Sequence, residues 1–156
     1  MLIVCAAGVA GALVQRAAPD EAAGFAEVID GDSIRILGRE IRLRGIDAPE
    51  YHQTCRNDRG EVPCGRDARA ALAALTARGL TRCRLAGRDR YGRELGHCSA
   101  GRLDLNAAMV RNGHAVAYGG FEAEEAAARA ARRGLWALRF ERPADWRAQH
   151  QRERAS

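Results

Sequence analysis

The order in which short strand-like segments follow one another limits the fold of this chain more than any other feature. Apolar and polar residues alternate weakly in three early segments, and turn residues separate them, with Asp30-Gly31-Asp32 after the first and Gly38 after the second. Pro49 ends the third. We expect strands at 24–29, 33–37 and 39–46. Four residues should face inward from the last two of these strands: Ile34, Ile36, Ile41 and Leu43.

A helix then interrupts the strands. Residues 66–78 place an apolar stripe at helical spacing, and Gly79 suits the end of a helix. Two further strands are expected at 80–85 and 93–98. Strand-strand-strand-helix-strand-strand is the order of the OB fold, which often binds oligonucleotides. With two more helices at 103–112 and 121–133, we expect an α+β domain, a five-stranded OB-fold β-barrel with about three helices.

The two ends of the chain are expected to lie outside this domain. Leu2 to Val14 is an apolar run without a charge, too short to span a bilayer and typical of a signal-peptide core, although no basic residue precedes it. A buried first strand or helix is the alternative. We expect a signal or anchor segment and linker at 1–23, the domain at 24–140 and a tail at 141–156. Three aromatic side chains should pack back on the body: Trp136, Phe140 and Trp146.

The chain is basic, and all of its basic residues are arginine. It has 25 of them against 20 acidic residues, a formal net charge of +5. The planar arginine fork binds phosphate through two hydrogen bonds, which fits an anionic partner such as nucleic acid. GC-rich coding would explain the missing lysines equally well, and many basic proteins bind no nucleic acid. Charge alone therefore does not choose a function.

Four of the five cysteines lie outside the apolar run that holds Cys5. They form no C-x-x-C pair, which argues against zinc, and in an exported chain they suggest two disulfides. Cys83 and Cys98 fall on the expected strand pair at similar distances from its turn, so their Cβ atoms should approach. Cys55 and Cys64 bracket one polar loop. We predict the bridges Cys55–Cys64 and Cys83–Cys98, with four free thiols as the alternative.

Acidic residues lie near the ends of the first three expected strands. If these strands form a meander, Asp30, Asp32, Asp47 and Glu50 can gather at one end of the barrel. Oxygen ligands favour a hard cation such as calcium or magnesium. Arginines beside such a cluster would suit phosphodiester cleavage, because they stabilise the charge of the transition state. Taken singly, each acid is also explained by turn chemistry, and each arginine by a solvated strand face.

Three motifs, in order, carry a resemblance to a known family. V-I-D-G-D-S at 28–33, I-R-L-R-G-I-D-A-P-E at 41–50 and D-R-Y-G-R at 89–93 resemble the staphylococcal nuclease family. L-N-A-A-M-V-R-N-G at 105–113 and G-L-W at 134–136 extend the match. The resemblance covers roughly residues 25–137, nearly the whole chain after the apolar segment.

The resemblance implies a role for each matching residue. Asp32 and Asp47 would bind calcium through their carboxylates, and Ala48 through its backbone carbonyl. Glu50 would act on the attacking water, while Arg42 and Arg93 would hold the scissile phosphate. The remaining residues would support the site or the substrate: Asp30 behind the metal ligands, Arg90 and Tyr91 near a terminal phosphate, and Tyr118 near a stacking position. The histidines His52, His97, His114 and His150 share no spacing, and we interpret them as structural or exposed.

The expected function is a calcium-dependent phosphodiesterase, an endo- or exonuclease that hydrolyses DNA and RNA with little sequence preference and gives 3′-phosphate products. Single-stranded DNA and RNA are the expected partners. The protein would be a monomer without an obligate protein partner, and it would be exported to the periplasm or secreted. The alternative is a non-catalytic envelope module that binds nucleic acid or another anionic polymer. A third possibility is a protein of envelope polysaccharide metabolism that retains nuclease-like residues.

Overall fold

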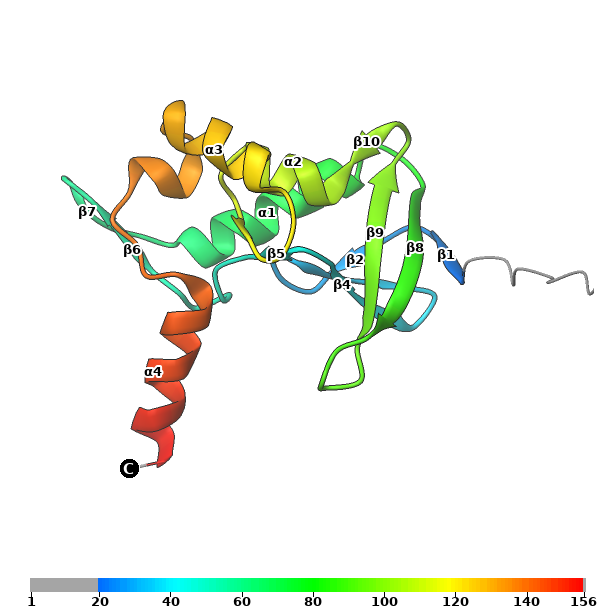
Figure 1. Ribbon diagram of the computed structural model, residues 1–156, viewed down its shortest axis with the longest axis horizontal. Coiled ribbons are helices and arrows are strands. Elements are labelled where there is room, and N and C mark those ends of the chain that lie inside the picture. Colours follow the sequence, from blue (N-terminus) through cyan, green and yellow to red (C-terminus); the bar gives the residue numbers. More distant parts are fainter. Residues whose placement is uncertain (1–19, 156) are drawn as a thin grey trace, which may run out of the picture.

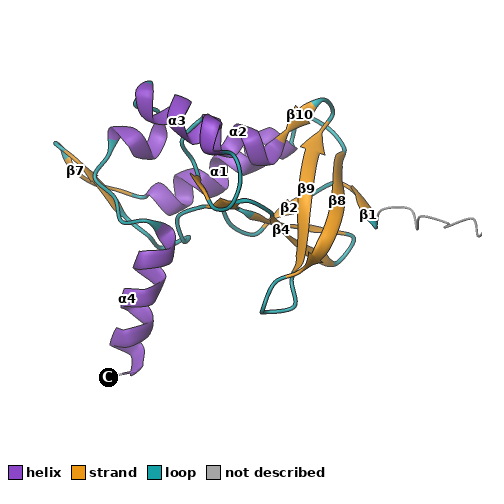
Figure 2. Cartoon of the chain, in the orientation of Figure 1, coloured by secondary structure: helices purple, strands orange, loops and turns teal. Residues whose placement is uncertain are grey.

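The computed structural model describes residues 20–155, which form a mixed sheet and four α-helices (Figures 1 and 2). The strands are β1 (Glu21–Gly24), β2 (Glu27–Val28), β3 (Ser33–Ile36), β4 (Arg39–Leu43), β5 (Ile46–Asp47), β6 (Cys55–Asn57), β7 (Gly60–Val62), β8 (Thr81–Arg88), β9 (Glu94–Ala100), β10 (Leu103–Asp104) and β11 (Val116–Ala117). The helices are α1 (Cys64–Thr76), α2 (Leu105–Arg111), α3 (Glu122–Ala130) and α4 (Pro143–Ala155), with a 3-10 turn at Gly134–Ala137.

The main sheet is open, which corrects the expected closed, five-stranded barrel. Its strand order is β1-β8-β9-β4-β3-β2, with β10 on β9, and β4 runs parallel to β9. Within residues 20–155 the end strands β1 and β2 do not pair with each other. β1 pairs with β8 on the side away from β9, and Ala22 lies opposite Cys83 in this pair. Residues 21–23 therefore belong to the sheet and not to a linker.

The third expected strand, at 39–46, forms two separate strands, β4 and β5. Gly45 adopts a left-handed φ of 82°, and the chain bends there between β4 and β5. The amide of Tyr118 donates to the carbonyl of Gly45 at 2.9 Å, and β5 pairs with β11 so that Asp47 lies opposite Val116. This second small sheet fixes the backbone of Asp47.

The expected inward positions form the main core. Ile34, Ile36, Ile41 and Leu43 are fully buried, and α1 contributes Ala68, Leu72 and Leu75. Figure 1 shows α1, α2 and α3 grouped beside the β8–β9 hairpin, while α4 extends away from them. Asp104 caps α2 by accepting from the amide of Ala107 at 2.9 Å.

Both predicted disulfides are present. Cys83 lies directly opposite Cys98 in the β8–β9 pair, and Cys55 is bonded to Cys64 with their Cα atoms 5.7 Å apart. The polar loop that Cys55 and Cys64 bracket contains the hairpin β6–β7, and the bridge joins β6 to the first residue of α1. Cys5 and the apolar segment 2–14 lie outside the described residues.

The C-terminal segment packs on a second, smaller core. Cys55, Cys64, Val116 and Leu135 are its buried members, and Trp136 and Phe140 pack against them as expected. Trp146 instead stacks on His150 within α4, with ring centres 3.8 Å apart. In the described part of the chain, no helix combines the length and apolar character needed to cross a membrane.

Candidate active site

Two buried carboxylates lie at strand ends and share one arginine. Asp32 precedes β3 and is 2% exposed, and Asp47 ends β5 and is 1% exposed. Arg42 on β4 lies opposite Ser33 of β3, which directs its side chain toward both acids. Its Nη1 donates to Oδ1 of Asp32 at 2.9 Å, and its Nη2 donates to Oδ1 of Asp47 at 2.7 Å. The guanidinium therefore bridges the two acids.

The loop that carries Asp32 is packed tightly against its neighbours. The amide of Asp32 donates to Oδ1 of Asp30 at 3.0 Å, and the amide of Ala48 donates to Oδ2 of Asp32 at 2.9 Å. A Cβ on Gly31 would lie 2.7 Å from the Cβ of Ala48 and 2.8 Å from that of Ala68. The small residues at 31, 48 and 68 thus let this loop approach β5 and α1.

Burial makes the charge of Asp32 costly. It raises the pKa of Asp32 to about 7, an effect that Arg42 opposes and that the neighbouring charges of Asp30 and Asp47 reinforce. Burial alone would lower the pKa of Arg42, but Asp32 and Asp47 outweigh it and raise that pKa. The charged form of Asp32 therefore depends on Arg42, and a cation bound beside it would stabilise that form further.

The donor types fit a hard cation. Asp32 and Asp47 offer carboxylate oxygens, and the backbone of Ala48 adjoins them. Within residues 20–155 no cluster of three or more His, Cys, Asp or Glu side chains forms a complete metal cage. A cation here would therefore need backbone oxygen, water or substrate oxygen as further ligands.

Glu50 is paired with an arginine that sequence reasoning missed. Arg147 of α4 donates from Nη1 to Oε1 of Glu50 at 2.9 Å and to Oδ1 of Asp47 at 3.0 Å. Its Nη2 donates to Oδ2 of Asp47 at 3.1 Å. Burial would lower the pKa of Arg147, but these bonds to Asp47 and Glu50 raise it. Arg147 lies in the expected tail, and no motif spacing connects it with residues about a hundred positions earlier.

The backbone of Glu50 is fixed by a second missed residue, Gln53. The side-chain oxygen of Gln53 accepts from the backbone amide of Glu50 at 3.2 Å. The backbone amide of Gln53 donates to the backbone carbonyl of Glu50 at 2.7 Å. The side-chain nitrogen of Gln53 donates to the carbonyl of Glu141 at 2.8 Å. A Cβ on Gly65 would overlap the carbonyl oxygen of Glu50. The Glu50 turn is thus held between α1 and the segment before α4.

Arg93 is held by the turn between β8 and β9. Asp89 accepts from the Nε of Arg93 at 2.8 Å and from the backbone amides of Tyr91 and Arg93 at 2.8 and 3.0 Å. Burial would raise the pKa of Asp89, but these hydrogen bonds outweigh it and lower that pKa. The guanidinium groups of Arg90 and Arg93 lie 4.8 and 5.5 Å from the centre of the Tyr91 ring.

One pocket of about 600 Å³ collects most of the residues singled out from the sequence. We call it the catalytic pocket because three residues that the motifs predict to be catalytic line it. The full set of lining residues is Asp30, Arg42, Glu50, Asp89, Arg90, Tyr91, Arg93, Tyr118 and Arg147. Asp32, Asp47 and Ala48 do not line it but lie buried behind Arg42. Tyr91 and Tyr118, which line it, are 63% and 66% exposed.

Comparison with known families identifies the family of this chain. The family model described as staphylococcal nuclease homologue matches residues 40–138, which is more than half of the chain. The chain belongs to the staphylococcal nuclease family. The match contains the second and third motifs, at 41–50 and 89–93, and the predicted family is thereby confirmed.

Relatives in this family carry different names. The succinoglycan biosynthesis protein ExoI of Rhizobium meliloti (strain 1021) is 47% identical over 96 residues, 60% of this chain and 50% of that protein. The probable staphylococcal-like nuclease CAN2 of Oryza sativa subsp. japonica is 34% identical over 134 residues, 80% of this chain and 34% of that protein. Endonuclease YhcR of Bacillus subtilis (strain 168) is 30% identical, matching 89% of this chain and 14% of that protein. The chain thus spans half or less of these relatives.

Proposed function

We propose that the chain is a calcium-dependent phosphodiesterase that cleaves single-stranded DNA and RNA. The observation that carries this proposal is the catalytic pocket, where Arg42, Arg93 and Glu50 line one space in front of two buried carboxylates. Membership of a family with nuclease-named relatives supports the same class of activity.

Each residue has a task in this proposal. Asp32, Asp47 and the carbonyl of Ala48 would hold calcium, which when bound neutralises charge on a phosphate oxygen. Arg42 and Arg93 donate to the phosphate oxygens and stabilise the charge that grows on them. Glu50 accepts a proton from the attacking water, and Arg147 orients its carboxylate. Water adds to phosphorus as the bond to the 5′ oxygen breaks, and that oxygen takes a proton from solvent, which gives a 3′-phosphate and a 5′-hydroxyl.

The substrate preference follows from what the catalytic pocket presents. Arginines contact phosphate, which is common to every nucleotide, and the exposed rings of Tyr91 and Tyr118 can stack on any base. We therefore propose little sequence preference, and Arg90 and Tyr91 as contacts of a terminal phosphate. The carboxylate of Asp30 accepts a hydrogen bond from the backbone amide of Asp32 and so supports that residue. Asp30 is not proposed as a metal ligand.

The proposed location is the periplasm or the outside of the cell. Two disulfides are typical of an oxidising compartment. Residues 1–23 would contain the signal or anchor segment that exports the domain, and the exported protein would act as a monomer.

A second candidate function rests on one relative. The 47% identical protein is named for succinoglycan biosynthesis, which supports a role in envelope polysaccharide metabolism or the binding of an anionic polymer. In that case the arginines would bind polymer charge without phosphodiester cleavage.

An assay of the purified chain separates these candidates. Single-stranded DNA and RNA are incubated with the protein in calcium, and then in calcium with excess chelator. Fragments ending in 3′-phosphate with calcium, and intact strands with chelator, are expected. Cleavage at an equal rate in chelator would refute the calcium requirement, and intact strands under both conditions would favour the second candidate.

A further inference from the structure

We propose that a groove between α4 and the loop after Glu50 binds the polynucleotide strand beyond the scissile phosphate, by stacking bases on Trp146 and Tyr51. We call it the α4 groove, and it rests on the proposed nuclease function. It begins with a cavity of about 310 Å³ lined by Glu50, Tyr51, His52, Trp146, Arg147, His150 and Gln151.

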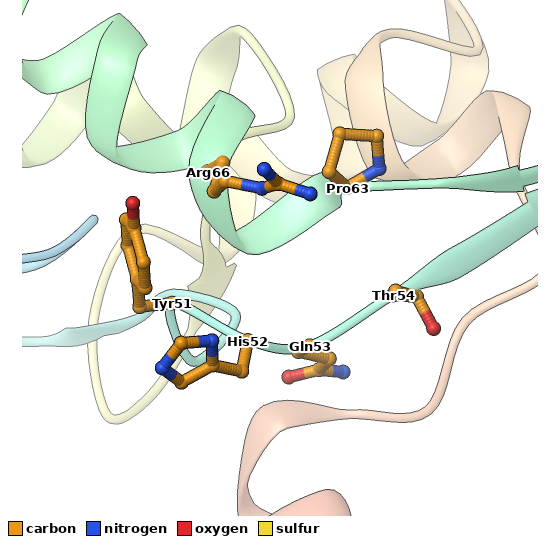
Figure 3. A pocket seen from close by; sticks show the side chains of 6 residues that line it. All are labelled: Tyr51, His52, Gln53, Thr54, Pro63 and Arg66. Carbon is orange, nitrogen blue, oxygen red and sulfur yellow. The ribbon is translucent and has the colours of Figure 1, made fainter.

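The α4 groove adjoins the catalytic pocket. Glu50 and Arg147 line both, so their ion pair forms the wall that the two spaces share. A further cavity of about 220 Å³ shares Tyr51 and His52 with the α4 groove and reaches Arg66. Figure 3 shows Tyr51 and His52 on the loop, with Arg66 across from them at the start of α1. A strand leaving the catalytic pocket would pass Glu50 and Arg147 and follow these two cavities along the loop after Glu50.

Neighbouring side chains fix the orientation of two aromatic residues along this path, Trp146 and Tyr51. Trp146 and His150 stack with centres 3.8 Å apart and planes 23° from parallel. Tyr51 is 41% exposed, its ring meets His52 edge-on at 4.9 Å, and the guanidinium of Arg69 lies 5.9 Å from its centre. Arg69 is itself fixed by hydrogen bonds to backbone carbonyls. Neither Trp146 nor Tyr51 belongs to a hydrophobic core cluster in residues 20–155.

The charges along the path favour a polyanion. Arg147 and Glu50 neutralise each other, so the positive charge of the path comes from Arg66, which lines the further cavity, and from Arg69 beside Tyr51, which donates to backbone carbonyls. Rings interleaved with arginines bind single-stranded nucleic acid, because bases stack on the rings while the cations attract the backbone. Tyr91 and Tyr118 line the catalytic pocket but not the α4 groove, so the scissile phosphate would lie between two sets of rings.

Tryptophan fluorescence tests the α4 groove without relying on cleavage. The chain has two tryptophans, so Trp136→Phe leaves Trp146 as the only one. In excess chelator, an eight-nucleotide oligo(dT) should quench Trp146 fluorescence, whereas thymidine monophosphate at the same nucleotide concentration should not. Equal emission with and without the long strand would overturn the proposal. Quenching by alginate, an acidic polysaccharide, but not by oligo(dT) would also overturn it.

Kinetics of matched variants give the second readout. Trp146→Leu keeps apolar bulk on α4 but removes the aromatic face, and Trp146→Phe keeps a ring. With the oligonucleotide we expect Trp146→Leu to raise KM by about tenfold with kcat nearly unchanged, and Trp146→Phe to recover most of the loss. Phe25→Ala removes an exposed ring that lines none of these three cavities and should leave KM unchanged.

The two readouts separate this proposal from the nuclease proposal. Quenching of Trp146 by a strand that is never cut would support the α4 groove and reject the nuclease. Cleavage with the same KM in wild type and Trp146→Leu would reject the α4 groove and keep the nuclease. Circular dichroism checks that α4 is intact, and loss of affinity in both the Leu and Phe variants with normal spectra would reject base stacking.

Discussion

At the residue scale, the site depends on Arg147, because it joins Asp47 and Glu50 in one ion-pair network. Arg147→Ala should lower kcat about 10- to 100-fold, the usual cost of losing a group that orients a ligand or catalytic carboxylate. Arg147→Lys should recover part of this loss, since it restores charge without the two-pronged geometry. Steady-state kinetics on an oligonucleotide measure both variants.

A control at the same scale distinguishes orientation from loosening of α4. Arg142 precedes α4 and ties it to α3 through Glu125, at 3.1 Å, but does not line the catalytic pocket. Arg142→Ala should therefore leave kcat within about twofold of wild type. If the Arg142 and Arg147 variants lose kcat equally, Arg147 acts only by docking the helix.

At the scale of elements, the close approach of the Asp32 loop to β5 and α1 should limit what position 31 accepts. Gly31→Ala places a Cβ against Ala48 and Ala68, so we expect a loss of about 1–3 kcal/mol in the free energy of unfolding. Gly120→Ala is the matched control, because its nearest neighbour would be 3.7 Å away. Urea unfolding compares the two variants, and equal stability would show that the loop moves aside.

The junction of β4, β8 and β9 should make stability depend on acid. Glu94 accepts two hydrogen bonds from Arg39, both at 2.9 Å, and one from Arg88 at 2.9 Å. The bonds from Arg39 chiefly hold the pKa of Glu94 below its usual 4.5. The charged Glu94 therefore stabilises the folded state fully above pH 4.5, and this stabilisation is lost as the pH falls through the lowered pKa of Glu94.

Glu94→Gln tests this dependence on pH. The variant should be less stable than wild type at neutral pH, and the difference should shrink in strong acid, as followed by urea unfolding across the pH range. Glu27→Gln alters the exposed Glu27–Arg35 pair and should change stability little at any pH. If Glu94→Gln were less stable than wild type by the same amount from neutral to strongly acidic pH, the stabilising role of the Glu94 charge would be contradicted.

At the scale of the whole molecule, one disulfide reinforces a strand pair of the main sheet and the other ties an outlying hairpin to a helix. Cys83–Cys98 links β8 to β9, and Cys55–Cys64 ties the β6–β7 hairpin to α1. Each should contribute about 2–3 kcal/mol to stability, so reductant should lower the melting temperature. Protein denatured without reductant should show at most the thiol of Cys5, and four or more reactive thiols would contradict the bridges.

The sequence predicted the parts of this molecule that have local patterns. Alternation located the strands that bury Ile34 and Ile41, and the turn between β8 and β9 placed Cys83 opposite Cys98. β1 was missed because Glu21–Gly24 is alanine-rich and becomes a strand only by pairing with β8. Arg147 was missed because its contacts with Glu50 and Asp47 are made only in three dimensions.

The most direct test of the central claim is the single-turnover rate of strand cleavage by Arg93→Ala. Arg93 lines the catalytic pocket and is held by Asp89, whereas Arg35 forms an exposed pair with Glu27 and does not line it. With a 5′-labelled oligonucleotide and calcium, Arg93→Ala should cut about 100-fold or more slowly than wild type, and Arg35→Ala should cut normally. Equal rates in all three proteins would contradict the claim that this pocket cleaves phosphodiester bonds.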